Sequence, residues 1–343
     1  MVTIYDIAKE AKVSPATVSR VISGSARVSP EKERIVRGLI EKYHFRPNAI
    51  AKSLIGGQSR IIGLLVADIR NPFYAELSVA CEKAAKQAGY HIMLRNVFND
   101  DTIEDDSLEM FVEHRVDAII QLGCRVDALV SDARYVDHVN KIAEKIPFVS
   151  TGSLDGGNSY VFGIDNNVAM DQIFEYLRGL GHKKIAFIGG WINVRSTYEK
   201  WTRYVYLHGK YGIALNQNFV QEGGYGFPEG YACMKKLLAL GDRPTAVIVV
   251  NDYAATGALS AIREEGLSVP GDFSVVSYDN TFLAEITMPR LTSVDYGYET
   301  LGAGLVRSAV SLINQQEVPR VTKIAPQLRI KDSCKPIFET DNK

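Results

Sequence analysis

The sequence predicts an α/β protein with two lobes built on parallel sheets, preceded by a small helix-turn-helix head. The first 60 residues carry short helical patterns and no strand-like apolar run. From residue 60 onward, short apolar runs alternate with amphipathic stretches, which is typical of βαβ units with a parallel sheet. A second series of the same kind follows the first, and this repetition indicates two similar lobes.

Length and composition set limits on the function. The chain has 343 residues, enough for two or three domains, and its 46% hydrophobic and 23% charged residues are those of an ordinary globular protein. No apolar run reaches the ~18 residues of a membrane span, and residues 1–10 lack the layout of a signal peptide, so we expect a cytoplasmic protein with no membrane partner. The four cysteines and six histidines show no metal-binding spacing, which predicts no metal and no cofactor.

Charge is distributed unevenly along the chain. Residues 1–60 contain eleven Lys and Arg against five Asp and Glu, a charge of +6, whereas the whole chain carries −1. The remaining 283 residues therefore carry −7. A basic head on an acidic body indicates that the head binds a polyanion such as nucleic acid.

Helix start signals divide the head into three predicted helices. Thr3 followed by Asp6 has the pattern of a capping box. Ser14-Pro15 and Ser29-Pro30 each place an N-cap residue before a proline at the first helical position. The predicted helices span residues 4–11, 16–22 and 30–43. Two short helices joined by a tight turn and followed by a third form the helix-turn-helix plan.

Three segments carry a resemblance to a known family. They are Ile4-Tyr5-Asp6-Ile7-Ala8-Lys9-Glu10-Ala11, Val13-Ser14-Pro15-Ala16-Thr17-Val18-Ser19-Arg20-Val21 and Arg46-Pro47-Asn48-Ala49-Ile50-Ala51-Lys52-Ser53-Leu54. The chain resembles the lactose-repressor (LacI/GalR) family of bacterial transcription regulators, and the resemblance continues along nearly its whole length. It implies a repressor that binds double-stranded DNA at a pseudo-palindromic operator under the control of a small effector.

The second predicted helix is the expected reader of the DNA sequence. With its N-terminal residues toward the bases in the major groove, Arg20 could contact a guanine, while serines hold phosphates. Taken one by one, these residues could equally be a capping serine or a surface arginine. The DNA-contacting residues that we expect are Thr3, Tyr5, Ser14, Pro15, Ala16, Thr17, Ser19, Arg20, Asn48, Ala51, Lys52 and Leu54.

Residues 48–60 are predicted to form a hinge. Asn48 can cap a helix over residues 49–54, and Gly56-Gly57 ends it. A helix of two turns is marginal alone, so we expect it to order against its dyad mate and the DNA, as the family's hinge helix does. The resemblance implies that Leu54 wedges into a central base step through the minor groove, and the alternative is that Leu54 packs on the neighbouring domain.

The expected domain order follows from these patterns. It comprises a DNA-binding domain (1–47), a hinge and linker (48–60), an effector-binding and dimerisation domain (61–334) and a polar tail (335–343). Lobe one is expected over about 61–160 and 294–318, and lobe two over about 161–293 and 319–334. The predicted strands are 61–66, 116–120 and 148–150 in the first series and 161–164, 184–188, 246–250 and 274–277 in the second. Such lobes resemble periplasmic sugar-binding proteins.

A ligand site is predicted beyond the carboxyl ends of these strands, where open α/β sheets bind their ligands. Carboxylates and amides that pair with hydroxyls, beside aromatic rings, favour a carbohydrate or nucleoside, and the acidic residues there would repel an anion. The candidates are Asn71, Phe73, Tyr74, Asp165, Trp191, Ser196, Lys200, Tyr225, Asn251, Asp252 and Asp279. Acids after strands can instead cap the next helix, and Phe73 can pack between lobes. Lys200 stands where the family usually has an arginine, which leaves the identity of the effector open.

Other function classes have weaker support. The chain shows no GxGxxG after the first strand, no phosphate-binding lysine motif, no HExxH and no GxSxG, so we expect no enzyme. Two alternatives remain, a stand-alone sugar-binding receptor and a regulator controlled by a protein partner. The basic head argues against the receptor. Residues 330–343 lack the leucine heptads of tetrameric family members, which predicts a homodimer.

Overall fold

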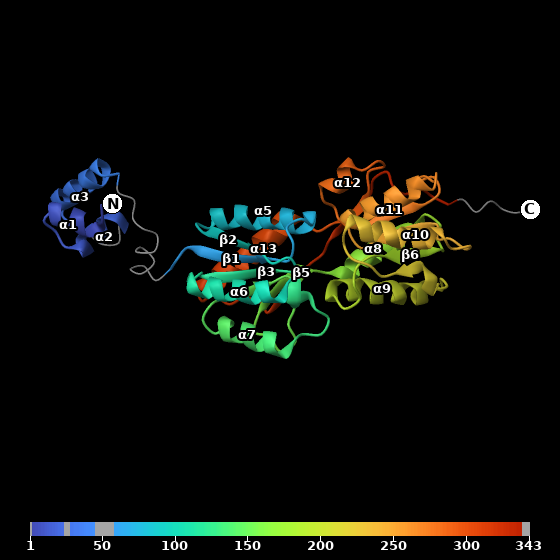
Figure 1. Cartoon of the computed structure of the whole chain (residues 1–343), viewed down its shortest axis with the longest axis horizontal. Helices are drawn as coiled ribbons and strands as arrows, with labels where there is room; N and C mark the ends of the chain where they lie inside the picture. Colours follow the sequence, from blue (N-terminus) through green and yellow to red (C-terminus); the bar gives the residue numbers. More distant parts are fainter. Residues whose placement is uncertain (1, 24–27, 45–57, 338–343) are drawn as a thin grey trace, which may run out of the picture. The chain divides into compact units, whose positions relative to one another are not determined.

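The computed structural model describes residues 2–23, 28–44 and 58–337. The chain divides into two compact units at the bond between Arg60 and Ile61. The first unit is the helical head, and the second is an α/β body that holds both lobes (Figure 1).

The head has the predicted helix-turn-helix plan, with helices α1 (Ile4–Glu10), α2 (Pro15–Ser23) and α3 (Pro30–Lys42). The capping box at α1 is present, because the Asp6 amide donates to Thr3 Oγ1 and the Thr3 amide donates to the Asp6 carboxylate. Ile7, Val18 and Val36, one from each helix, have no exposed surface. These side chains form the centre of a small core that belongs to the head itself.

Two sheets of six strands form the body, and each belongs to one lobe. The first sheet has the order β11 (Val321–Ile324), β5 (Tyr160–Ile164), β4 (Phe148–Ser150), β3 (Ala118–Leu122), β1 (Ile61–Val66) and β2 (His91–Asn96). The second has the order β12 (Gln327–Arg329), β10 (Thr292–Asp295), β9 (Ser274–Asp279), β8 (Ala246–Val249), β6 (Ile185–Ile188) and β7 (Val220–Gln221). Strand pairs in both sheets are parallel except β10 with β12, so the predicted fold class is confirmed.

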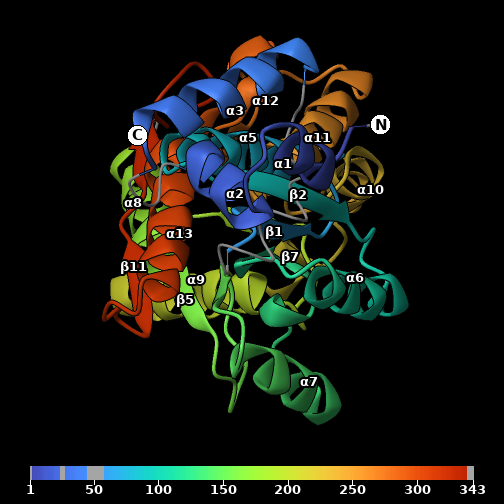
Figure 2. The same ribbon diagram turned by 90° about the vertical axis from the view of Figure 1, so that its left-hand side faces the viewer.

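Helices cover both faces of the first sheet. α5 (Pro72–Gln87) and α13 (Tyr298–Ile313) pack on one face, and α6 (Asp101–Glu113) and α7 (Ala133–Ala143) pack on the other (Figures 1 and 2). Alternation along β1 sends Leu64 to the first face and Leu65 to the second, and both are fully buried. A strand with both faces covered is continuously apolar, which is why β1 was evident in the sequence.

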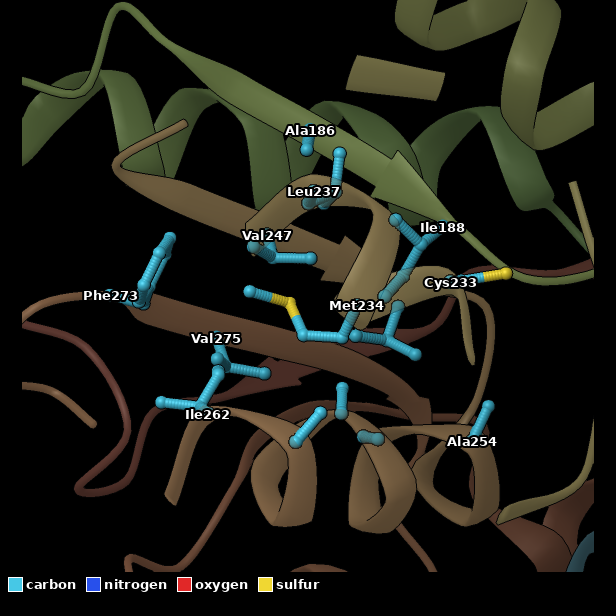
Figure 3. Packing of buried hydrophobic residues seen from close by; sticks show 14 of the residues in the cluster. Ala186, Ile188, Cys233, Met234, Leu237, Val247, Ala254, Ile262, Phe273 and Val275 are labelled. Carbon is cyan, nitrogen blue, oxygen red and sulfur yellow. The ribbon is translucent and has the colours of Figure 1, made fainter. Parts of the chain in front are cut away.

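The second sheet is covered in the same way. α8 (Asn166–Gly179) and α9 (Arg195–Tyr211) lie on one face, and α10 (Phe227–Leu238) and α11 (Asp252–Glu264) lie on the other. Figure 3 shows Met234 of α10 and Ile262 of α11 packed over Val247 and Val275 of the strands. The two helices approach closely at Gly230, which has no side chain. A Cβ at this position would lie 1.9 Å from the Ala254 carbonyl oxygen.

The lobe assignment of one predicted strand is wrong. Residues 161–164 belong to β5, which pairs with β4 and β11 in the first sheet and not in the second. The chain enters the second lobe only after β5, returns to the first lobe after β10, and passes from β11 to β12 at the end. The expected return to lobe two at residue 319 is also wrong, because β11 completes the first sheet. The first lobe therefore takes residues 61–164 and 298–324, and the second takes 166–295 and 327–334.

Candidate functional site

The head exposes three of the six residues at and after the start of α2 that were predicted to contact DNA. Ser14, Ala16 and Arg20 are exposed, whereas Val18 and Val21 on the opposite side of α2 are buried. Tyr5, from α1, is 71% exposed. The remaining predicted residues of the described head are Thr3, which is exposed, and Pro15, Thr17 and Ser19, which are half-buried. The predicted hinge contacts Asn48, Ala51, Lys52 and Leu54 lie outside the described residues.

Two of these hydroxyls, those of Thr3 and Ser14, belong to helix caps. Thr3 Oγ1 donates to the Asp6 carboxylate over 2.7 Å within the capping box. Ser14 Oγ accepts from the Thr17 amide over 3.2 Å and so caps the start of α2. Both residues therefore position a helix whether or not they also contact a phosphate.

In the body, a chamber of about 230 Å³ lies between the lobes, at the carboxyl ends of strands from both sheets. We call it the inner chamber. Polar and aromatic side chains from α5, α9 and the ends of β8 and β9 line it. Eight of the predicted site residues are brought together in this lining: Asn71, Phe73, Tyr74, Ser196, Lys200, Tyr225, Asn251 and Asp279.

Lys200 is a buried cation in the chamber wall. The residue is 6% exposed, and its ammonium group donates a long 3.4 Å hydrogen bond to the Val250 carbonyl and lies 4.2 Å from the centre of the Tyr278 ring. Burial lowers the pKa of Lys200, and the charges of Asp279 and Asp127 oppose that effect. A cation with so little solvation favours a ligand that offers it an acceptor oxygen.

Asp279 ends β9 with a strained backbone. Its φ is +95°, in the left-handed region that side chains other than glycine seldom occupy. Burial raises the pKa of Asp279, Lys200 opposes this rise, and Asp252 adds to it. Strain and a buried titratable group at one strand end are typical of a functional site.

Asp127 is a chamber residue that the sequence analysis missed. It closes the 3₁₀ helix η1 (Cys124–Asp127), which follows β3, and it accepts a 2.7 Å hydrogen bond from Ser196 Oγ of the other lobe. Burial raises the pKa of Asp127 to about 6, although the Ser196 hydrogen bond and the Lys200 charge act against this rise. The strand-end rule applied to β3 would have found it, since Asp127 lies five residues after that strand.

Charges in the inner chamber are matched. Among the described residues of the lining, the carboxylates are Asp127, Glu199 and Asp279, and the cations are Arg195, Lys200 and Lys323. The Lys323 ammonium pairs with Glu199 over 3.2 Å, and Arg195 pairs with Asp155 over 3.0 Å. An uncharged ligand suits such a lining better than an anion or a cation.

The structure places two predicted carboxylates outside the chamber lining. Asp252 has no exposed surface, and its oxygens accept hydrogen bonds from Ser277, Ser293 and Thr281. Asp165 caps α8 by accepting from the Asn167 and Val168 amides. Both are acids that follow a strand and satisfy the local structure, which was the alternative left open in the sequence.

A second space adjoins the first and contains the remaining predicted residue. This outer chamber, of about 750 Å³, is lined by Trp191, whose residue surface is 47% exposed. Asn71, Tyr74, Asp127, Ser196 and Tyr225 line both chambers, so these side chains form the border between the two spaces.

The described residues contain no cluster of His, Cys, Asp or Glu suited to a metal ion. Within the same ranges, none of the helices has the length and apolar character needed to cross a membrane.

Comparison with known proteins places the chain in a family. The model of the lacI family of bacterial regulatory proteins matches residues 3–48, and that of a periplasmic binding protein-like domain matches residues 174–334. The HTH-type transcriptional repressor PurR of Mannheimia succiniciproducens is 32% identical over 98% of this chain and 100% of its own. The chain belongs to the lacI family. Catabolite control protein A of Priestia megaterium is 31% identical over 97% of this chain and 99% of its own.

A solved structure agrees with this lacI-family assignment along both units. The lac repressor dimer bound to operator and the anti-inducer ONPF has a TM-score of 0.87 and 25% identity, covering 97% of this chain and 99% of that one. The resemblance seen in the sequence is thus confirmed, and the lacI-family chain is a DNA-binding transcription regulator.

Proposed function

We propose that this lacI-family chain is a transcription repressor that binds a pseudo-palindromic operator as a homodimer, and that a neutral carbohydrate in the inner chamber controls this binding. We choose a neutral effector because the lining of the inner chamber has equal numbers of carboxylates and cations. The exposed side of α2 supports the choice of DNA-reading surface.

The residues proposed to contact the DNA bases lie at the start of α2. Ala16 and Arg20 stand four residues apart on the exposed side of the helix, while Val18 is fully buried in the head core. An arginine one turn into a recognition helix can donate two hydrogen bonds to guanine O6 and N7. A single head reads one half-site, so a palindromic operator requires two chains.

An exposed apolar face of the body offers a surface for the second chain. Phe282 and Ile286 of α12 (Phe282–Ile286) are 55% and 68% exposed, and Met288 just after it is 96% exposed. The Phe282 amide donates to Glu76 of α5, so the half-exposed Val79 of α5 lies one turn from this contact. We call Val79, Phe282, Ile286 and Met288 the α5–α12 face. Apolar residues gathered on a surface are typical of interfaces.

A sugar suits the inner chamber because its hydroxyls both donate and accept. They can donate to Asp127 and Asp279 and accept from Lys200, while the aromatic rings of Phe73 and Tyr225 meet the apolar side of a sugar ring. A related solved structure, a CelR–cellobiose complex, contains such a ligand; it covers 97% of this chain with a TM-score of 0.71 and 25% identity.

In this proposal the angle between the two lobes controls DNA binding. The Asp127–Ser196 hydrogen bond, the Arg195–Asp155 ion pair and the 2.7 Å bond from the Leu129 amide to the Asn193 carbonyl all join the lobes beside the chamber. A ligand that fits one lobe angle better than another shifts the population toward that angle by its difference in affinity.

The test combines DNA and effector measurements on the full chain. Operator candidates are selected from a random duplex pool, and the retained sequences are assayed by gel shift at low and moderate salt. We expect one pseudo-palindromic site whose binding persists at moderate salt and responds to a neutral sugar in a thermal-shift panel. Binding without sequence preference would contradict the repressor proposal. A response only to charged metabolites, or to no small molecule, would contradict the carbohydrate proposal.

A further inference from the structure

We propose that the effector consists of two linked sugar rings, one held in the inner chamber and the second held in the outer chamber against Trp191. This inference rests on the proposed carbohydrate effector and adds its size and its second contact surface.

The size of the inner chamber limits what it can hold. Its volume of about 230 Å³ lies below the ~300 to 1,000 Å³ of typical small-molecule sites. One sugar ring suits this space, and a second ring has to extend beyond it. The outer chamber, of about 750 Å³, provides the adjoining space.

The junction between the chambers is polar and aromatic. Tyr225 contributes to both linings, and its hydroxyl is fixed by a 2.8 Å hydrogen bond with Thr197 Oγ1. Asn71, which caps α5, and the Asp127–Ser196 pair also belong to both linings. In the proposed complex the glycosidic link crosses this border, and its flanking hydroxyls exchange hydrogen bonds with these groups.

Trp191 is exposed although its loop is held firmly. The Gly190 amide donates to the Gly224 carbonyl over 3.0 Å, and the Ile192 amide donates to Glu222 Oε1 over 2.9 Å, so both neighbours of Trp191 are anchored. A Cβ at Gly190 would lie 2.6 Å from Thr197 Oγ1, so the loop packs against α9 with no room for a side chain there. An ordered loop that leaves an indole 47% exposed presents a preformed aromatic surface.

Polar groups of the outer chamber match sugar hydroxyls. Asn99 and Asn193 bring amides to its lining, and Glu229 brings a carboxylate. Arg70 forms a 2.6 Å ion pair with Asp68, so this cation already has a partner. Aromatic faces beside amide and carboxylate groups recognise carbohydrate rings, whereas an anionic second group would meet more acids than cations here.

The experiment compares one-ring and two-ring probes on the full chain. Binding of glucose and galactose and of cellobiose, maltose and lactose is measured by calorimetry for the wild type, Trp191→Ala, Trp191→Phe and Tyr206→Ala. Tyr206 is the matched control, because it is a 54% exposed aromatic residue that lines neither chamber.

We expect one disaccharide to bind the wild type at least tenfold more tightly than its constituent monosaccharides. Trp191→Ala should remove that advantage and leave monosaccharide affinity unchanged, Trp191→Phe should keep most of it, and Tyr206→Ala should keep all of it.

Equal affinity for one-ring and two-ring probes in the wild type would overturn the inference while the carbohydrate effector stands. An equal loss for both probe sizes in Trp191→Ala would also overturn it. If no probe binds, both the inference and the carbohydrate effector fail, and the gel shift still decides the DNA-binding role.

Discussion

Lys200 and Asp279 reach the inner chamber from α9 and from the end of β9, and both have lost most of their contact with water. Burying each charge costs free energy that a nearby opposite charge only partly returns. A ligand lowers this free energy when one of its hydroxyls accepts a hydrogen bond from the ammonium group and another donates a hydrogen bond to the carboxylate. Effector affinity is therefore expected to depend strongly on these two side chains.

Asp279→Asn tests the carboxylate. Asparagine tolerates the positive φ of this position and has the same shape, so the fold is expected to stay intact. Above pH 8, where Asp279 is ionised although burial raises its pKa to about 8, loss of this charged acceptor should weaken effector binding about 10- to 100-fold, since hydrogen bonds to charged groups contribute about 1.5 to 3 kcal/mol. Operator affinity without effector should not change. Fluorescence anisotropy with labelled operator measures both quantities, and Asp137→Asn on the exposed side of α7 is the control.

Asp127→Asn tests the pH dependence of stability. Burial raises the pKa of Asp127 from 3.8 to about 6. Between these two pH values the folded chain keeps the carboxyl proton, whereas the unfolded chain has lost it. Wild-type stability therefore falls across that range as the pH rises, whereas asparagine cannot ionise. Relative to wild type, the variant should gain about 1 to 3 kcal/mol between pH 4 and pH 7. Melting temperatures over this range measure the gain, and a difference independent of pH would contradict it.

Arg20→Ala tests the base contact. The change should cost about 1 to 3 kcal/mol of specific affinity and relax the preference at one base pair in each half-site. Arg134→Ala, which removes a 95% exposed arginine side chain from the body, should leave the affinity unchanged. Selection of binding sites from random duplexes gives both the affinity and the preference. A uniform loss on every sequence would assign Arg20 to a phosphate instead.

Elements with both faces buried were the ones that the sequence predicted well. β1 is a continuous apolar run, β3 is apolar apart from Gln121, and the helices that cover them have clear start signals. β2 was missed because it is an edge strand with exposed and half-exposed side chains. β10 was missed because Thr292 and Ser293, although buried, are polar and are satisfied by hydrogen bonds.

The same difference explains the outcome for the candidate site. Residues next to evident strands, such as Asn71 and Asn251, were predicted and line the inner chamber. Tyr296 also lines it but follows β10, the strand that was not predicted. Asp252 was predicted for the right place in the chain and the wrong role, because sequence position does not show which way a side chain at a strand end points.

Asp252→Ala tests the structural role of that residue at the junction of α11 with β9 and β10. The change leaves the hydroxyls of Ser277, Ser293 and Thr281 without their acceptor inside the protein. Unsatisfied buried groups of this kind should lower the free energy of unfolding by about 2 to 4 kcal/mol. Urea unfolding followed by circular dichroism measures the loss. A stability equal to that of the wild type would contradict the structural assignment.

The whole molecule is expected to be a homodimer, and Ile286→Glu tests the α5–α12 face. A charge at Ile286 within this apolar face should separate the chains, because burying an unpaired carboxylate costs several kcal/mol. We expect the mass of two chains for the wild type and of one for the variant by light scattering, with a matching loss of operator affinity. Val130→Glu, at an 82% exposed apolar residue away from this face, is the control. A wild-type mass near four chains would contradict the prediction.

The chain passes between the lobes three times. These crossings determine the order in which the parts of the molecule are completed during translation. The head closes its core with α3, which ends at Lys42, whereas each sheet waits for an edge strand, β11 or β12, from residues 321–329. At about 5 to 20 residues per second, translation of the intervening chain takes on the order of 15 to 60 seconds. During that interval the basic head can fold while the inner chamber still lacks Val321 and Lys323 of β11. Each nascent chain therefore completes the core of its DNA-binding head before it completes the chamber proposed for the effector.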